Sequence, residues 1–81
     1  MVVHVRVNGS LAEALGSSRH TIQVPQGATV SDLLDAFSAQ HPGAADLISR
    51  AVAVAGGKHV APATKLAENQ EMALLMPIAG G

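Results

Sequence analysis

The chain has 81 residues, 48% of them hydrophobic, and a formal net charge of −1 at pH 7. This length accommodates one small domain and excludes a second. Charged residues make up only 14% of the chain, and Phe37 is its one aromatic residue, so a strongly basic nucleic-acid module and a base-stacking platform are both excluded. The absence of cysteine rules out a disulfide scaffold, a thiolate zinc site and a cysteine nucleophile.

The hydropathy pattern gives no sign of a membrane segment. No apolar run approaches the ~18–20 residues that span a bilayer. The first residues alternate between apolar and polar types, unlike the continuous apolar stretch of a signal peptide. A cysteine-free composition also fits a reducing compartment. We therefore expect a cytoplasmic protein with no membrane and no nucleic-acid partner.

The first part of the chain predicts a β-hairpin. Residues 3–7 alternate valine with polar residues, which indicates a half-buried strand, and Asn8-Gly9 is a turn signal. Residues 11–16 predict one helical turn or a loop that ends at a glycine. Residues 20–24 alternate again before Pro25. Two such strands so close in sequence favour an antiparallel pair.

One long helix follows. Thr29 and Asp32 have the spacing of a capping box, in which the cap residue and an acid three positions later satisfy each other's backbone groups. Pro42 disfavours the helical region for His41 and therefore ends the helix. The helix is predicted to pack one face against a sheet, because its apolar residues recur with helical spacing: Val30, Leu33, Leu34 and Phe37.

The second half predicts a short helix and more strands. Residues 44–50 are expected to form a helix with Leu47 and Ile48 buried. Residues 51–55 and 58–60 are expected to form strands joined by a Gly56-Gly57 hairpin turn. Asn69 follows in a polar turn and tolerates a left-handed conformation. Residues 72–76 form the last strand, whose nearly continuous apolar sequence predicts burial on both faces.

These elements define an α+β fold. One main helix and four to five strands require a two-layer core. If the last, most apolar strand is central and lies beside the first, the sheet is mixed, with one parallel central pair. That arrangement is the ubiquitin-like β-grasp. We expect residues 1–76 to form the domain and residues 77–81 to form a flexible C-terminal Gly-Gly tail.

The tail is the most informative segment. A frayed end is one interpretation, since most termini are loose. The other is a tail built for insertion into a partner, because glycine has no Cβ and can thread a narrow channel. Five extended residues reach up to roughly 17 Å at ~3.3–3.6 Å each. The reactive group would be the α-carboxylate of Gly81, and the threading segment would be Pro77, Ile78, Ala79 and Gly80.

Over essentially its full length, the chain resembles the MoaD/ThiS sulfur-carrier proteins, which are bacterial relatives of ubiquitin. The resemblance is carried by the valine-rich first strand, residues 11–16 as a small helical segment, the helix start at residues 27–34, the Val52-Ala53-Val54 strand and, above all, residues 66–81. The Leu-Leu-Met-Pro-Ile-Ala-Gly-Gly ending is more similar to the small subunit of molybdopterin synthase than to the shorter thiamin-pathway carrier.

The resemblance implies a chemistry for Gly81. A ubiquitin-activating-type adenylyltransferase would adenylate its carboxylate with ATP, and sulfur transfer would convert it to a thiocarboxylate. The tail would then enter the molybdopterin synthase large subunit and deliver sulfur for molybdenum cofactor biosynthesis. In this scheme the chain is not catalytic alone and binds no cofactor; ATP is used by the activating partner.

Other residues allow alternative interpretations. The four histidines show no metal-ligand spacing, so no metal site is expected. Asp32 and Asp35 lie near a helix start, where carboxylates interact favourably with the helix dipole. We prefer this interpretation to a role in acid–base catalysis. The alternating residues of the last strand are expected to be core or, alternatively, an exposed patch that docks a partner: Met72, Leu74 and Met76. The alternatives for function are a carrier for thiamin or cysteine synthesis, a ubiquitin-like modifier conjugated through Gly81, and an inert interaction domain.

Overall fold

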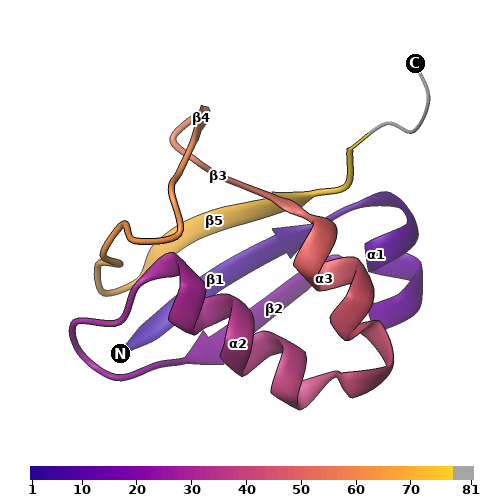
Figure 1. The fold of residues 1–81 in the computed structure, drawn as a ribbon, viewed down its shortest axis with the longest axis horizontal. Coiled ribbons are helices and arrows are strands. Elements are labelled where there is room, and N and C mark those ends of the chain that lie inside the picture. Colours follow the sequence, from indigo (N-terminus) through magenta and orange to yellow (C-terminus); the bar gives the residue numbers. More distant parts are fainter. Residues whose placement is uncertain (78–81) are drawn as a thin grey trace.

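A computed structural model of the chain describes residues 1–77, which form a mixed sheet covered by helices (Figure 1). The strands are β1 (Val2–Val7), β2 (Arg19–Gln23), β3 (Val52–Ala55), β4 (Lys58–His59) and β5 (Gln70–Leu75). The helices are α1 (Gly9–Leu15), α2 (Val30–Gln40) and α3 (Ala45–Arg50), with a short 3-10 turn η1 (Pro42–Ala44) before α3.

The strand order across the sheet is β2-β1-β5-β3-β4. The central strands β1 and β5 are parallel, with Val5 opposite Met72, and the other neighbours are antiparallel. This confirms the predicted α+β β-grasp with its parallel central pair. The first and last strands of the described chain therefore lie side by side at the centre of the sheet.

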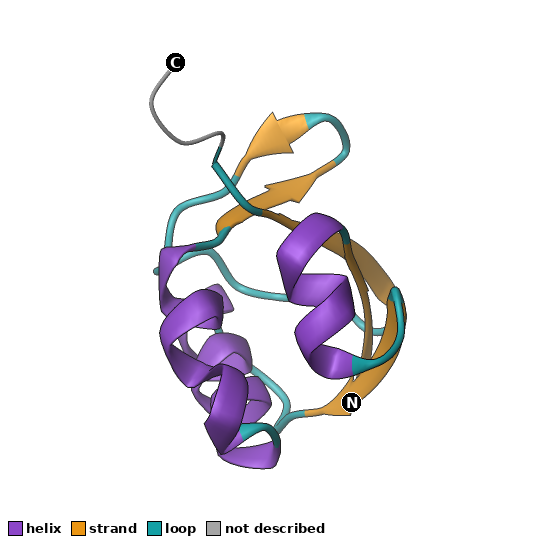
Figure 2. Cartoon of the chain, turned by 90° about the vertical axis from the view of Figure 1, so that its right-hand side faces the viewer, coloured by secondary structure: helices purple, strands orange, loops and turns teal. Residues whose placement is uncertain are grey.

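The helices gather on one side of the sheet, and the core lies between the two layers (Figure 2). Along β1, the valines are buried while His4 and Arg6 are exposed, as the alternation predicts. Phe37 is fully buried at the centre of the α2 face. The opposite face of the sheet is left open, and the candidate site is found on that side.

The start of α2 is fixed by the predicted capping box. The Thr29 hydroxyl oxygen accepts from the Asp32 backbone N–H at 3.3 Å, and the Asp32 carboxylate accepts from the Thr29 backbone N–H at 2.9 Å. Two backbone donors that the helix leaves without intrahelical partners are thereby satisfied. The helix ends before Pro42, also as predicted.

Two predicted turns contain residues with positive φ, as the sequence indicates. Gly56 and Gly57 have φ angles of 59° and 77° and join β3 to β4. Asn69 has a φ of 60° in the turn before β5. These are left-handed conformations that glycine and asparagine adopt more readily than other residues.

Three expectations need correction. The last strand is not buried on both faces, because helices cover only one side of the sheet, and Leu75 is 38% exposed. In α3, Ile48 is buried, but Leu47 is only half-buried. Residues 11–15 belong to the seven-residue helix α1, which is capped by Gly16 in a left-handed conformation with a φ of 78°.

Candidate functional site

The C-terminal segment leaves the domain from the central strand of the sheet. β5 is held on one side by β1 and on the other by β3, where Leu75 lies opposite Val52. Met76 is half-buried against the core, and Pro77 is exposed. The chain therefore leaves the sheet shortly after a strand that is paired on both sides.

Pro77 is suited to end the pairing of β5. Proline has no backbone N–H to donate to a neighbouring strand, and it holds the preceding residue in an extended conformation. Ladder pairing of β5 stops at Leu75, two residues earlier. The other predicted tail residues, Ile78, Ala79, Gly80 and Gly81, lie outside the described residues, so their roles stay predictions.

The predicted docking residues occupy different places. Met72 and Leu74 are 2% and 0% exposed and face the helices, which agrees with the interpretation of these two residues as core and not with the alternative of an exposed patch. Both share the face of Val5 and Val7, since the parallel register places them opposite those buried valines. Met76 is half-buried at the end of the strand.

The outward side chains of β5 are the ones missed from the sequence. Glu71, Ala73 and Leu75 alternate with the buried pair and point to the open face. Because Ala73 and Leu75 are themselves apolar, the sequence of β5 shows no alternation that would reveal its exposed side. The signal that could have found them is the pairing with β1, where the exposed face is marked by His4 and Arg6.

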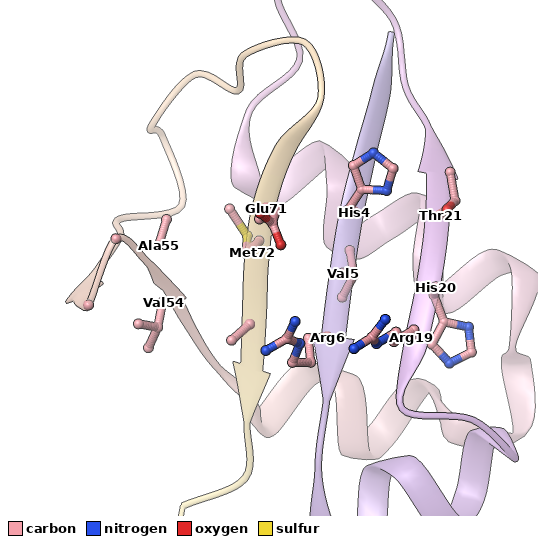
Figure 3. Close-up of a pocket in the computed structure, with 13 residues that line it drawn as sticks. His4, Val5, Arg6, Arg19, His20, Thr21, Val54, Ala55, Glu71 and Met72 are labelled. Carbon is pink, nitrogen blue, oxygen red and sulfur yellow. The ribbon is translucent and has the colours of Figure 1, made fainter.

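The open face carries a shallow groove of about 430 Å³ (Figure 3). It runs from β2 across β1 and β5 to the β3–β4 hairpin. Arg6 and Arg19 make its β1–β2 side basic, whereas its β5 and hairpin side is mainly apolar and includes one acid, Glu71. The groove is also lined by His4, Glu71, Ala73 and Val54.

The histidines do not assemble into a metal site. His4 projects from the open face, whereas His20 lies opposite buried Val5 and packs on the helical side. There the rings of His20 and His41 pack against Phe37 at centroid distances of 5.3 Å each, in a tilted and a T-shaped arrangement. Within residues 1–77 no group of three histidine, aspartate or glutamate side chains is arranged to hold a metal ion.

The two aspartates of α2 also have a structural explanation. Asp32 is engaged in the capping box with Thr29, and Asp35 is exposed one turn later. They do not converge on the groove, which is lined by strands and the β3–β4 turn. The interpretation as residues that stabilise the helix start is confirmed for Asp32.

No helix within residues 1–77 is long and apolar enough to cross a bilayer.

Comparison with known proteins places these features in a family. Residues 5–81 match the ThiS family, a span that includes the Gly80-Gly81 ending. No curated protein matches the chain in sequence.

Among solved structures, small archaeal modifier protein 1 from Haloferax volcanii is 27% identical with a TM-score of 0.89, and each chain covers 100% of the other.

Two further structures share the fold at lower identity. A putative molybdopterin converting factor subunit 1 from Pyrococcus furiosus is 19% identical, with a TM-score of 0.85, over 96% of this chain and 99% of that one. A complex of subunits 1 and 2 of the molybdopterin-converting factor from Helicobacter pylori contains a chain that is 20% identical, with a TM-score of 0.70 and full coverage of both chains. With its ubiquitin-like β-grasp fold and a family match that extends to the last residue, the chain belongs to the ThiS family of ubiquitin-like sulfur carriers.

Proposed function

We propose that the chain carries sulfur as a thiocarboxylate on Gly81 and acts as the small subunit of molybdopterin synthase. The observation that carries this proposal is the way the chain leaves the sheet. The central strand β5 leads directly to exposed Pro77, and the family match continues through Gly80 and Gly81. The domain would present the terminus, and partner proteins would supply the catalytic side chains.

The chemistry begins with an unreactive carboxylate. An adenylyltransferase of the ubiquitin-activating type would let the Gly81 carboxylate attack the α-phosphorus of ATP, releasing pyrophosphate and forming an acyl-adenylate. A sulfur nucleophile supplied by the partner system would then displace AMP and leave a terminal thiocarboxylate. The chain has no cysteine, so no internal thiol would compete for the activated acyl group.

The large subunit of the synthase is the proposed acceptor. A homologous fold occurs in the two-subunit molybdopterin-converting factor complex of Helicobacter pylori, which supports a partner of this kind. In that subunit the thiocarboxylate sulfur would displace an oxygen leaving group from a pterin precursor, and water would then hydrolyse the acyl–sulfur bond, which leaves the sulfur on the precursor and restores the Gly81 carboxylate. We place this exchange in the cytoplasm.

A second function is favoured by the 27% identity to small archaeal modifier protein 1. In that case the ε-amine of a lysine on another protein would attack the activated Gly81 carbonyl and form an isopeptide bond. The first steps of the two functions are the same, because both need an activated terminal carboxylate. A sulfur carrier for thiamin or cysteine synthesis is a third possibility with the same terminus.

Intact mass spectrometry of the protein isolated from its own cells tests the proposal. The carrier predicts a fraction of the chain with one oxygen replaced by sulfur at Gly81. Adducts of the chain on lysines of other proteins would indicate the modifier instead. If the terminus carries neither form, in cells grown with active molybdenum cofactor synthesis, the proposal is wrong.

The choice of pathway needs a second experiment. The thiocarboxylate form should support molybdopterin formation when mixed with the large synthase subunit from the same genome and the pterin precursor. The matched control is the same chain with an unmodified Gly81 carboxylate. Activity with thiamin-pathway enzymes alone would assign the carrier to that pathway.

A further inference from the structure

Two arginines lie directly opposite each other on the open face of the sheet. Arg6 on β1 is the register partner of Arg19 on β2, and both are exposed. They share the face opposite to the buried valines of β1. Figure 3 shows both guanidinium groups on the same side of the sheet, at one end of the groove.

This pairing works against the fold. Like charges directly opposite on neighbouring strands destabilise a sheet. Within residues 1–77 the one ion pair is between Arg50 and Asp46 on α3, so neither groove arginine has an acidic partner there. Glu71, the acid in the groove, lies opposite His4 rather than opposite Arg6. Two like charges placed opposite each other, with no acidic partner within residues 1–77, are therefore available to bind acidic groups from outside the domain.

The surroundings of the pair indicate what binds. The row of side chains that begins with Arg19 and Arg6 continues across the sheet through Ala73 and Val54. A small anion would use only the guanidinium end of this row. A protein surface would use the whole groove, with carboxylates at the basic end and an apolar side chain over Ala73. Paired guanidinium groups are well suited to bind carboxylates.

On β5, the groove lies close to the point where the tail begins. β5 contributes Ala73 to the groove and exposes Leu75 before the chain reaches Pro77. A protein that takes up the tail must lie against this end of the domain.

We propose that Arg6 and Arg19 receive acidic side chains of the protein that accepts the tail, and that the neighbouring apolar row seats an apolar side chain of the same protein. This inference rests on the proposed function. Charges at such a site steer association and select the partner more than they add affinity. The arginine pair would therefore lower the stability of the free domain slightly and favour recognition of an acidic partner.

The probe is the large synthase subunit from the same genome, with binding measured by calorimetry and association rates by surface plasmon resonance. Arg6→Ala and Arg19→Ala should each weaken binding by about fivefold or more, mainly through slower association. Raising salt from about 50 mM to about 300 mM should weaken binding of the original chain and have less effect on these variants.

Arg19→Glu separates recognition from structure. It places an acid opposite Arg6, so the Tm of the free domain should rise by about 1–5 °C while binding falls by at least about tenfold. A residue with a structural role alone would not move stability and affinity in opposite directions. The control is Lys65→Glu, which makes the same change in net charge outside the groove and should leave affinity within about twofold.

The outcomes distinguish this inference from the proposed function. If the original chain binds the large subunit and the arginine variants bind equally well, the inference is wrong and the proposed function stands. If inorganic phosphate binds at Arg6 and Arg19 but does not compete with the large subunit, the pair is a small-anion site and the inference is also wrong. If the original chain does not bind the large subunit at all, both are overturned.

Discussion

The carboxylate of Glu68 accepts a hydrogen bond from the backbone N–H of Val2 at 2.7 Å, although the two residues are 66 positions apart. The adjacent Asn69 N–H donates to the Val2 carbonyl at 2.8 Å. Together these bonds fasten the turn before β5 to the start of β1. They fix the register between the two central strands, β1 and β5, and this register determines which residues of β5 face the core.

Removing this carboxylate should loosen the start of the central pair. Glu68→Ala leaves the Val2 N–H without its protein acceptor, and because the site is exposed, water replaces part of the loss. We expect a decrease of about 0.5–1 kcal/mol in the free energy of unfolding, measured by urea denaturation. Glu13→Ala, at an exposed position of α1, is the control and should change stability by less than about 0.5 kcal/mol. Equal effects of the two changes would contradict the role of the Glu68–Val2 bond.

The capping box should contribute measurably to stability. Thr29→Ala removes the hydroxyl that accepts from the Asp32 N–H, and such losses cost roughly 0.5–2 kcal/mol. Thr29→Ser keeps the acceptor and should lie close to the original chain. The shift of the urea midpoint measures both variants. If serine and alanine destabilise equally, the hydroxyl does not act as a cap.

Adjacent leucines on β5 test the assignment of its two faces. Leu74→Ala removes a fully buried side chain and should cost about 2–5 kcal/mol, because a cavity remains in the core. Leu75→Ala removes a side chain that is 38% exposed and should cost less than about 1.5 kcal/mol. Thermal or chemical unfolding gives both values. A larger loss at Leu75 than at Leu74 would mean that the strand faces are reversed.

Deletion of Gly81 should separate function from folding. Within residues 1–77 the buried core runs from Val3 to Leu74, and the deletion leaves all of it in place. The Tm should therefore stay within roughly 2 °C of the original value. Thiocarboxylate formation by the activating enzyme should be lost, and extending the chain beyond Gly81 should have the same effect. A marked fall in Tm on deletion would show that the terminus supports the fold.

Local sequence predicted most of the fold because its signals are strong where one face of an element is polar. Valines alternate with His4 and Arg6 along β1, and the capping box marks the start of α2 at Thr29. β5 offers no such contrast, because Ala73 and Leu75 are as apolar as their buried neighbours. Its exposed face depends on the register with β1, which is a long-range property and cannot be read from the strand alone.

The groove was missed for a related reason. Arg6 was expected on the polar face of the first strand, but Arg19 lay outside the predicted second strand, which was expected to begin at His20. Their alignment depends on a connection that contains the whole of α1. The predicted role of Gly81, by contrast, came from a family resemblance and from the chemistry of a Gly-Gly terminus, and not from the fold.

The position of β5 makes the presentation of the tail depend on correct folding of the domain. Because this strand pairs with both β1 and β3, the point where the chain leaves the sheet exists only after residues from both ends of the domain have come together. A chain in which β1, β3 and β5 have not assembled lacks this exit point and the groove. An enzyme that must recognise both features would modify intact molecules and pass over damaged ones.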